Sequence, residues 1–138
     1  MNNTLLELER TTLYYRRYCN EILKEKSVGL TYDQWNVLVA ISKLETGTQK
    51  ELSQRTLKDP ASITRILDIL EKNGTALREA VSNDRRSYNI SLTEAGKSII
   101  RKVNPLLEEI NTSALKRISK SNQKVLSECF YKIQNNIN

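Results

Sequence analysis

The stretch TQKELSQRTLKDPASITRILDILEKNG (residues 48–74) has the pattern of two short helices joined by a tight turn. Thr48 and Glu51 have the spacing of a capping box at the start of the first helix. Asp59 suits the N-cap of the second helix, and Pro60 suits its first position, where the missing N–H breaks no hydrogen bond. The closing Asn-Gly pair is typical of a helix end. The stretch therefore predicts a helix-turn-helix.

The two faces of the second helix differ in a way that suits contact with DNA. Isoleucine and leucine side chains form one apolar stripe, whereas the opposite face is small and polar near its start. Arg65 on that face can read guanine through two hydrogen bonds, and Ala61 can contact a thymine methyl group. Phosphate repels Asp68, so we expect it to pair with Arg65 or with an arginine of the hairpin that follows. The residues of the two helices expected to contact DNA are Thr48, Gln49, Lys50, Pro60, Ala61, Ser62, Thr64 and Arg65.

A β-hairpin is predicted directly after the two helices. One strand covers about residues 77–81, and a second strand with alternating apolar residues ends at Leu92. The residues at its tip include two adjacent arginines that support no core. A hairpin tip beside a recognition helix can place an arginine in the adjacent minor groove, where the potential is strongly negative. The hairpin residues expected to border DNA are Arg78, Asp84, Arg85 and Arg86.

Two helices are predicted before this region. Residues 4–26 form an amphipathic helix, with apolar side chains at spacings of three and four. A second helix starts after Thr31, which has capping-box spacing with a glutamine. Its inward face carries Trp35, Leu38 and Ile41.

Two further helices are predicted after the hairpin. Thr93 caps a long helix that Asn104 divides or Pro105 kinks. A last amphipathic helix begins at Ser121, and Cys129 on its apolar side is expected in core or interface packing. The terminal helices carry more apolar surface than the small central domain can cover, which predicts a dimer. The fold class is mostly α with a small β-hairpin wing, a winged helix-turn-helix with N- and C-terminal dimerisation helices.

The composition argues against several classes of site. The chain has 138 residues and a formal net charge of +6, which allows a polyanionic partner. It has no histidine, and Cys19 and Cys129 lie far apart, so histidine-based metal sites, histidine-dependent catalysis and a disulfide framework are excluded. We expect no enzyme activity, no cofactor and no metal. A cytoplasmic protein is expected, because the chain has neither a membrane-spanning apolar run nor a signal-peptide pattern at its start.

The sequence resembles the MarR family of bacterial transcription regulators. LTYDQWNVL (30–38) is similar to the helix that precedes the helix-turn-helix in that family, and residues 48–74 are similar to its two DNA-binding helices. DRRSYNISLTEAGK (84–97) matches its wing signature, Asp-x-Arg followed by Leu-Thr and Glu-x-Gly. The family usually has two apolar residues where this chain has Thr75 and Ala76, so looser packing between helix and wing is expected.

The resemblance implies a homodimer that binds a pseudo-palindromic operator in double-stranded DNA, with Asp84 and Arg86 as a pair in the wing. Residues 1–30 and 104–138 are then dimerisation helices, and residues 31–100 are the DNA-binding lobe of one domain covering 1–138. A two-fold dimer places its recognition helices about 34–36 Å apart, one turn of DNA. Members of the family are usually repressors relieved by a small molecule or an oxidant.

The sequence says less about the signal to which the protein responds than about its binding to DNA. Tyr15, Tyr18, Trp35 and Leu38 can line a pocket for a small phenolic or other aromatic effector, or they fill the core, which we favour. Cys19 has two interpretations: it is the reactive thiol of a redox-sensing regulator, or it is a small buried residue of its helix. We favour the second. A winged helix can also be a protein-interaction module without DNA contact, but Arg65 and the basic hairpin argue against this alternative.

Overall fold

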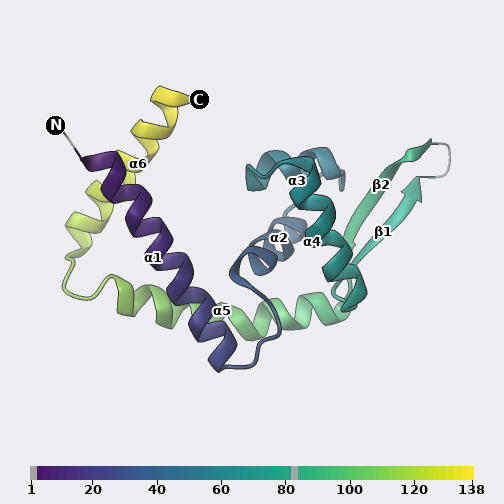
Figure 1. Cartoon of the computed structure of the whole chain (residues 1–138), viewed down its shortest axis with the longest axis horizontal. Helices are drawn as coiled ribbons and strands as arrows, with labels where there is room; N and C mark the ends of the chain where they lie inside the picture. The colour runs from purple at the N-terminus through teal and green to yellow at the C-terminus, as the bar shows by residue number, and fades with distance from the viewer. Residues whose placement is uncertain (1–2, 82–83) are drawn as a thin grey trace. The chain divides into compact units, whose positions relative to one another are not determined.

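The computed structural model of the chain describes residues 3–81 and 84–138, and the side chains of all of these except 84–87. The elements (Figure 1) are α1 (Thr4–Glu25), α2 (Tyr32–Ser42), α3 (Gln49–Thr56), α4 (Pro60–Lys72), β1 (Ala76–Val81), β2 (Asp84–Leu92), α5 (Glu94–Ala114) and α6 (Lys120–Ile137). The chain divides into two compact units, Met1–Pro105 and Leu106–Asn138. The predicted fold class, mostly helical with a two-stranded hairpin, is confirmed.

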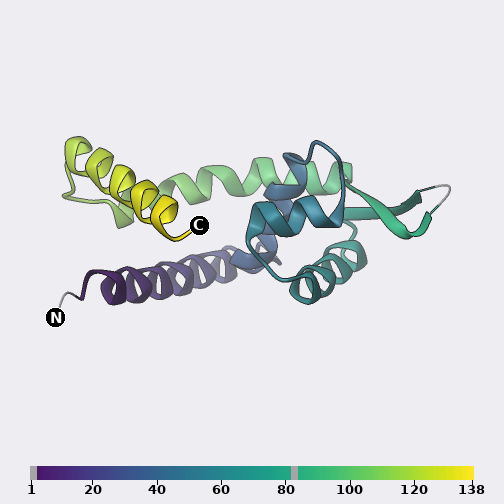
Figure 2. The same cartoon turned by 90° about the horizontal axis from the view of Figure 1, so that it is seen from above.

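The core of the first unit lies where α2, α3, α4 and the hairpin meet. The hairpin extends away from the end of α4 in both views (Figures 1 and 2). Each large apolar side chain that is fully buried contributes about 1.5–3 kcal/mol, so the apolar stripe of α4 fixes which face of that helix turns inward. The buried side chains of this core are Leu30, Val37, Leu38, Ile41, Leu52, Ile63, Leu67, Leu70, Ala76 and Ile90.

Capping residues start most helices where the sequence predicts. The Thr31 hydroxyl accepts from the Gln34 amide at 3.2 Å, and the Gln34 side chain accepts from the Thr31 amide at 3.0 Å, so the first capping box is complete. Thr93 caps α5 by accepting from the Gly96 amide at 3.0 Å. The prediction that the last helix begins at Ser121 is wrong, because Ser119 is the N-cap of α6.

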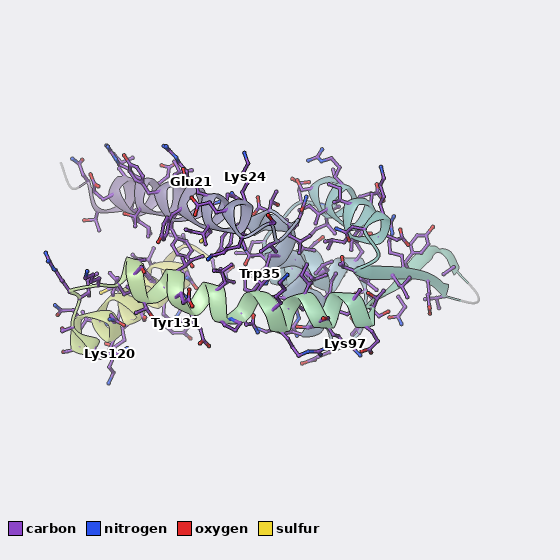
Figure 3. All side chains as sticks on the ribbon, turned by 90° about the horizontal axis from the view of Figure 1, so that it is seen from below. Glu21, Lys24, Trp35, Lys97, Lys120 and Tyr131 are labelled. Atoms are coloured by element: carbon purple, nitrogen blue, oxygen red, sulfur yellow. The ribbon has the colours of Figure 1, made fainter. Side chains whose placement is uncertain are left out.

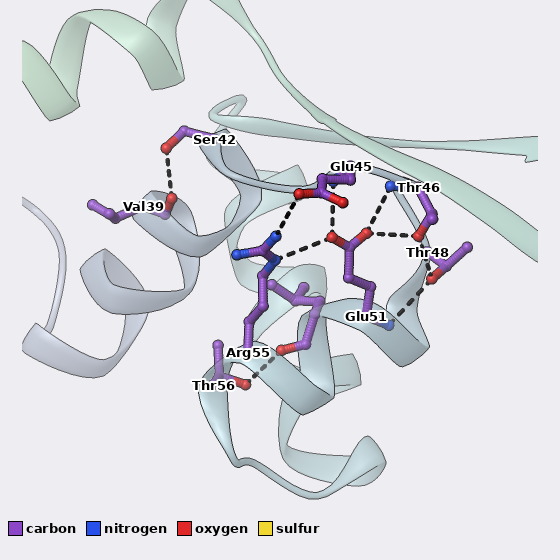
Figure 4. A network of polar contacts seen from close by, with 9 residues as sticks. Val39, Ser42, Glu45, Thr46, Thr48, Glu51, Arg55 and Thr56 are labelled. Atoms are coloured by element: carbon purple, nitrogen blue, oxygen red, sulfur yellow. Dashed lines mark hydrogen bonds and ion pairs between the residues drawn. The ribbon is translucent and has the colours of Figure 1, made fainter. Parts of the chain in front are cut away.

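The capping box predicted for Thr48 and Glu51 forms only in part. The Thr48 hydroxyl accepts from the Glu51 amide at 3.1 Å. The Glu51 carboxylate turns back to the preceding loop, where the amides of Glu45 and Thr46 each donate to it at 2.8 Å (Figure 4). The Glu45 amide, followed by the Thr46 hydroxyl, holds the pKa of Glu51 at about 2. The carboxylate thereby fastens the loop between α2 and α3 to the start of α3.

The hairpin joins the helices through close backbone contacts. β1 and β2 pair antiparallel, with Ala76 opposite Leu92. The expectation of looser packing here is wrong, because Thr75 and Ala76 are both buried and the Thr75 hydroxyl donates to the Leu70 carbonyl oxygen at 3.1 Å. A Cβ atom on Gly96 would lie 2.1 Å from the carbonyl oxygen of Thr75. Gly96 is therefore required because α5 closely approaches the chain just before β1.

Replacing Gly96 with alanine is expected to destabilise the protein by about 1–3 kcal/mol, because the added methyl group overlaps a backbone oxygen that cannot rotate away. Alanine favours a helix over glycine by up to about 1 kcal/mol, which is too little to offset this overlap. Urea unfolding measures the change. Ser98→Ala, at an exposed position of the same helix, is the control and should unfold like wild type. An unchanged midpoint for Gly96→Ala would contradict the packing described for α5.

The terminal helices differ in how much of their surface is covered within the chain. In α1, Cys19 and Leu23 are buried, whereas Glu21 and Lys24 are exposed and lie along one side of the helix (Figure 3). α5 continues through Pro105 as one helix, so Asn104 does not divide it. α6 has no buried residue, and Cys129, for which packing was expected, is exposed within the chain. Within residues 3–81 and 84–138, no helix combines the length and apolar character needed to cross a bilayer.

Candidate nucleic-acid interface

The turn between α3 and α4 brings the first residues of α4 to the surface. Leu57 ends α3 with a left-handed φ of 55°, and its side chain is 93% exposed. Ile63 and Leu67 of α4 are buried in the core, as predicted. The opposite face carries the exposed residues Ala61, Thr64, Arg65 and Asp68, with Ser62 half-buried beside them. The predicted outward face of α4 therefore exists and begins at the capped end of the helix.

Three side chains at the start of α4 form a chain of hydrogen bonds. Both oxygens of the Asp59 carboxylate bind Ser62, one accepting from its amide at 2.7 Å and the other from its hydroxyl at 2.9 Å. The Ser62 hydroxyl in turn accepts from Nη2 of Arg65 at 3.1 Å. The Ser62 amide and then its hydroxyl hold the pKa of Asp59 below its usual value. Arg65 is thus linked to the N-cap of its own helix.

Residues of α3 hold α4 from the other side. The side-chain Nε2 of Gln49 donates to the Thr64 hydroxyl at 2.9 Å, and that hydroxyl donates to the carbonyl oxygen of Pro60 at 2.9 Å. Thr48 uses its hydroxyl as the cap of α3, and Lys50 is exposed. Of the predicted contact residues of α3, Gln49 therefore lies against the start of α4 and connects the two helices through Thr64.

Arg78 of β1 is engaged by two carboxylates of α4. Its guanidinium donates to Glu71 through Nη2 at 2.9 Å and forms an ion pair with Asp68. The side chain is only 20% exposed. Burial alone would lower the pKa of Arg78, but the hydrogen bonds to Glu71 and Asp68 outweigh that effect and raise it. The expected pairing of Asp68 with a hairpin arginine is confirmed, and Arg78 fixes the first strand of the hairpin against α4.

For the arginines predicted at the hairpin tip, Arg85 and Arg86, the structure describes the backbone but not the side chains. The backbone of β2 begins at Asp84, which pairs with Val81 after an irregularity in the ladder at Ala80 and Val81. The side chains of Asp84, Arg85 and Arg86 are outside the described residues. Their contact with DNA stays a prediction.

An ion cluster that no pattern in the sequence indicates links α1, α2 and the turn between α3 and α4. The Asp33 carboxylate of α2 pairs with Arg16 of α1 and accepts from Nζ of Lys58, in the turn before α4, at 3.0 Å. Partial burial alone would raise the pKa of Asp33, but these two partners outweigh it and hold the pKa below its usual value. Residues so far apart in sequence give no local signal of such a contact.

A surface cavity of about 580 Å³ lies beside this cluster. Val39 and Ala40 give it apolar surface, and four of its side chains carry positive charge against the single carboxylate of Asp33. The charged side chains lining it are Arg16, Asp33, Lys43, Arg55 and Lys58.

Two of the predicted sensor residues, Tyr15 and Trp35, contact the ring of Tyr32. Tyr15 meets Tyr32 edge-on with ring centroids 5.7 Å apart, and Tyr32 stacks on Trp35 at 6.3 Å. Leu38 is fully buried in the core, and Tyr18 is 36% exposed. Of the four residues, Leu38 lies in the core as favoured, whereas Tyr15 and Trp35 are partly buried and Tyr18 is at the surface, so the interpretation that all four fill the core holds for Leu38 alone.

Cys19 has the environment of a structural cysteine. Its side chain is fully buried. Burial raises the pKa of the Cys19 thiol and outweighs the hydrogen bond with Tyr15, which lowers it. A raised pKa reduces the thiolate fraction on which reaction with oxidants depends. Among the side chains that the structure describes, no group of three or more Cys, Asp or Glu residues is arranged to hold a metal ion.

Known proteins share both the sequence and the arrangement of these elements. The sequence profile of the MarR family matches residues 30–88. The chain is 36% identical over 104 residues to the HTH-type transcriptional regulator SarZ of Staphylococcus epidermidis, and the alignment covers 72% of this chain and 70% of SarZ. The structure of a MarR mutant from E. coli complexed with operator DNA matches with a TM-score of 0.82 at 25% identity, over 95% of this chain and 96% of that one.

A third relative shares the fold at lower identity. BpsR of Bordetella bronchiseptica, whose DNA binding is regulated by 6-hydroxynicotinic acid, matches with a TM-score of 0.88 at 17% identity, over 96% of this chain and 99% of that one. MarR-family regulators bind DNA and are not enzymes, in agreement with the expectation from the sequence. This chain belongs to the MarR family of winged helix-turn-helix transcription regulators.

Proposed function

We propose that this protein is a homodimeric repressor that binds a pseudo-palindromic DNA operator and releases it when a small ligand binds. The observation that carries the proposal is the outward face at the start of α4, where Ala61, Thr64 and Arg65 are exposed. The second helix of a helix-turn-helix enters the major groove with its N-terminal residues leading. A face that is small and polar at that end allows the backbone to approach the base pairs.

The residues of this face have different roles in the proposal. Arg65 reads guanine through two hydrogen bonds, and Ala61 contacts a thymine methyl group. Lys50 and the residues around Thr48 meet phosphates, which position the protein without reading sequence. We assign Arg78 to holding the hairpin against α4 rather than to DNA, because Glu71 and Asp68 already neutralise its charge.

Exposed apolar side chains on the terminal helices support the proposed dimer. In α1, Leu5, Leu6 and Leu13 are 58%, 60% and 62% exposed. In α6, Val125 and Tyr131 are 53% and 66% exposed. Monomeric proteins seldom leave helices with this much uncovered apolar surface, and isolated amphipathic helices need a partner to be stable.

We propose that the effector is a small organic anion that binds in the cavity beside Asp33. A carboxylate there can replace Asp33 as the partner of Arg16 and Lys58, while its apolar body rests on Val39 and Ala40. Lys58 directly precedes Asp59, the N-cap of α4. A ligand that moves Lys58 therefore changes the turn that orients the DNA-reading helix. The buried Cys19 thiol favours such a ligand over an oxidant as the signal.

An anisotropy titration tests the proposed function. The probes are a labelled duplex from the DNA upstream of the protein's own gene and a scrambled duplex of the same composition. We expect much tighter binding to the first, and weaker binding to it when 6-hydroxynicotinic acid is present as an aromatic-acid probe. Equal affinity for both duplexes would contradict sequence-specific binding. Operator binding that no aromatic acid changes would contradict only the effector class.

Replacing Arg86 with alanine tests the proposed contact of the hairpin tip with the minor groove. The substitution is expected to weaken operator binding and to lower the slope of log affinity against log salt concentration by about one unit, because one cationic contact is lost. The loss should be greater when the flanking DNA is A·T-rich, since a narrow minor groove holds arginine best. Titrations over a salt series, on two operators that differ only in their flanks, measure both effects. Equal salt slopes for wild type and Arg86→Ala would mean that Arg86 does not contact DNA and that the hairpin tip is an ordinary solvent-exposed turn.

A further inference from the structure

The N-cap of α4 carries a negative charge at the surface where DNA is proposed to bind. Asp59 directly precedes the first turn of α4, close to the exposed Ala61 and Arg65. A carboxylate near phosphates opposes binding to DNA. Capping alone does not require the charge, because serine, threonine and asparagine cap helices about as well as aspartate. Attraction to the dipole of α4 accounts for about 0.3–1 kcal/mol of the contribution of this charge, and a second role follows from the contacts of the carboxylate.

The contacts of Asp59 point to that role. An ionised carboxylate can only accept hydrogen bonds, so the single hydroxyl proton of Ser62 is directed to Asp59, at 2.9 Å. The hydroxyl then offers only lone pairs to other groups, and Nη2 of Arg65 donates to it at 3.1 Å. The carboxylate thus keeps the hydroxyl proton of Ser62 away from Arg65 and leaves a lone pair for the guanidinium, which can only donate, although Asp59 does not touch Arg65 through a hydrogen bond itself.

We propose that Asp59 is a positioning residue for sequence recognition, which holds the Arg65 guanidinium at the start of α4 through the Ser62 hydroxyl. This inference rests on the proposed reading of guanine by Arg65. A guanidinium has five N–H groups, and the bond to Ser62 uses one, which leaves enough for the two acceptors of guanine. A side chain that is ordered before DNA arrives loses less conformational entropy on binding. Asp59 thereby raises the preference for guanine, while its charge lowers affinity for DNA of any sequence.

Asp59→Asn separates this role from capping. Asparagine keeps an oxygen that can accept from the Ser62 amide, so the cap is retained. Its amide group replaces the second oxygen and donates to the Ser62 hydroxyl oxygen. The hydroxyl proton then no longer points to residue 59 and can turn towards Arg65, where it weakens the hydrogen bond from Nη2. The first probe is the duplex that wild type selects from a library of random duplexes, each about three helical turns long. The other probes are the same duplex with single base-pair changes and a scrambled duplex. Anisotropy titrations give the ratio of affinities at each base pair, and thermal melts monitor folding.

Asp59→Asn is expected to reduce discrimination at the base pair read by Arg65 by about threefold to tenfold, the effect of one hydrogen bond. Its affinity for the scrambled duplex should stay equal or rise, because a negative charge is removed. Ser62→Ala, which leaves Asp59 as the cap, should lose discrimination at the same base pair. In an Arg65→Ala background, Asp59→Asn should change discrimination no further, as required when one residue acts through the other.

Two outcomes would overturn the inference alone. One is an equal loss of affinity for selected and scrambled duplexes in Asp59→Asn, which is the signature of a damaged cap. The other is a response of discrimination to Arg65→Ala without any response to Asp59→Asn and Ser62→Ala. If Arg65→Ala itself leaves discrimination unchanged at every base pair, the proposed reading by Arg65 fails and this inference fails with it.

Discussion

Removal of residues 120–138 is expected to convert a dimer into a monomer and to weaken operator binding by about two to four orders of magnitude. The second DNA-binding lobe of a dimer binds as an intramolecular event, and avidity of this size is lost when the lobes separate. α6 contributes no buried residue to its own chain, so its apolar side is available to a second copy. Size-exclusion chromatography with light scattering measures the mass, and anisotropy titration on the operator measures the affinity.

Point variants show whether the loss comes from the apolar side of α6 or from damage to the rest of the chain. Leu126, which is 42% exposed, is replaced with glutamate in the full-length protein. Lys124→Glu is the matched control, because residues two positions apart lie on opposite sides of a helix. We expect Leu126→Glu to be monomeric and Lys124→Glu to be dimeric, with similar thermal melts. A truncated chain that remains a stable dimer would show that the dimer does not depend on α6.

Replacing Arg65 with alanine is expected to cost about 1–3 kcal/mol in each half-site, and roughly twice that on a full operator with two half-sites. The loss should be confined to operators that carry the guanine contacted by Arg65. Binding to scrambled DNA should change little, because a bidentate contact to a base adds discrimination rather than general attraction. Titrations on the operator and on its single base-pair variants measure both quantities.

Lys50→Ala is the control for a phosphate contact in this comparison. Its side chain is exposed at the start of α3. Loss of a phosphate contact should weaken all duplexes to a similar extent and lower the salt slope by about one unit. If Arg65→Ala behaves in the same way as Lys50→Ala, Arg65 contacts phosphate and its assignment to guanine is wrong.

Local signals in the sequence predict the order of the elements and the faces of the helices. Thr31, Asp59 and Thr93 cap helices as expected, since a cap depends on residues only two or three positions away. The spacing of Ile63 and Leu67 identifies the buried side of α4, because an apolar stripe must turn toward the core. The outward face, and with it the candidate DNA-contacting residues of α4, follows from the same pattern.

Contacts between distant residues were beyond this kind of prediction. The sequence predicts a pairing of Asp68 with an arginine of the hairpin, but it does not indicate that this arginine is Arg78 or that Glu71 binds it as well. Glu51 has capping-box spacing, yet the loop before α3 offers its carboxylate two amides at 2.8 Å. Asp33 meets Lys58 across 25 positions of sequence. Each of these contacts depends on tertiary geometry that no short pattern records.

Selection of DNA from a library of random duplexes tests the central claim most directly, that α4 reads base pairs in a symmetric dimer. Wild type and Arg65→Ala are each incubated with the library, and the bound duplexes are sequenced. We expect wild type to enrich an inverted repeat whose half-site centres lie about one helical turn apart. We expect Arg65→Ala to lose one G·C pair from each half-site of that consensus. A library that emerges without enrichment, a consensus without an inverted repeat, or the same consensus from both proteins would contradict the central claim.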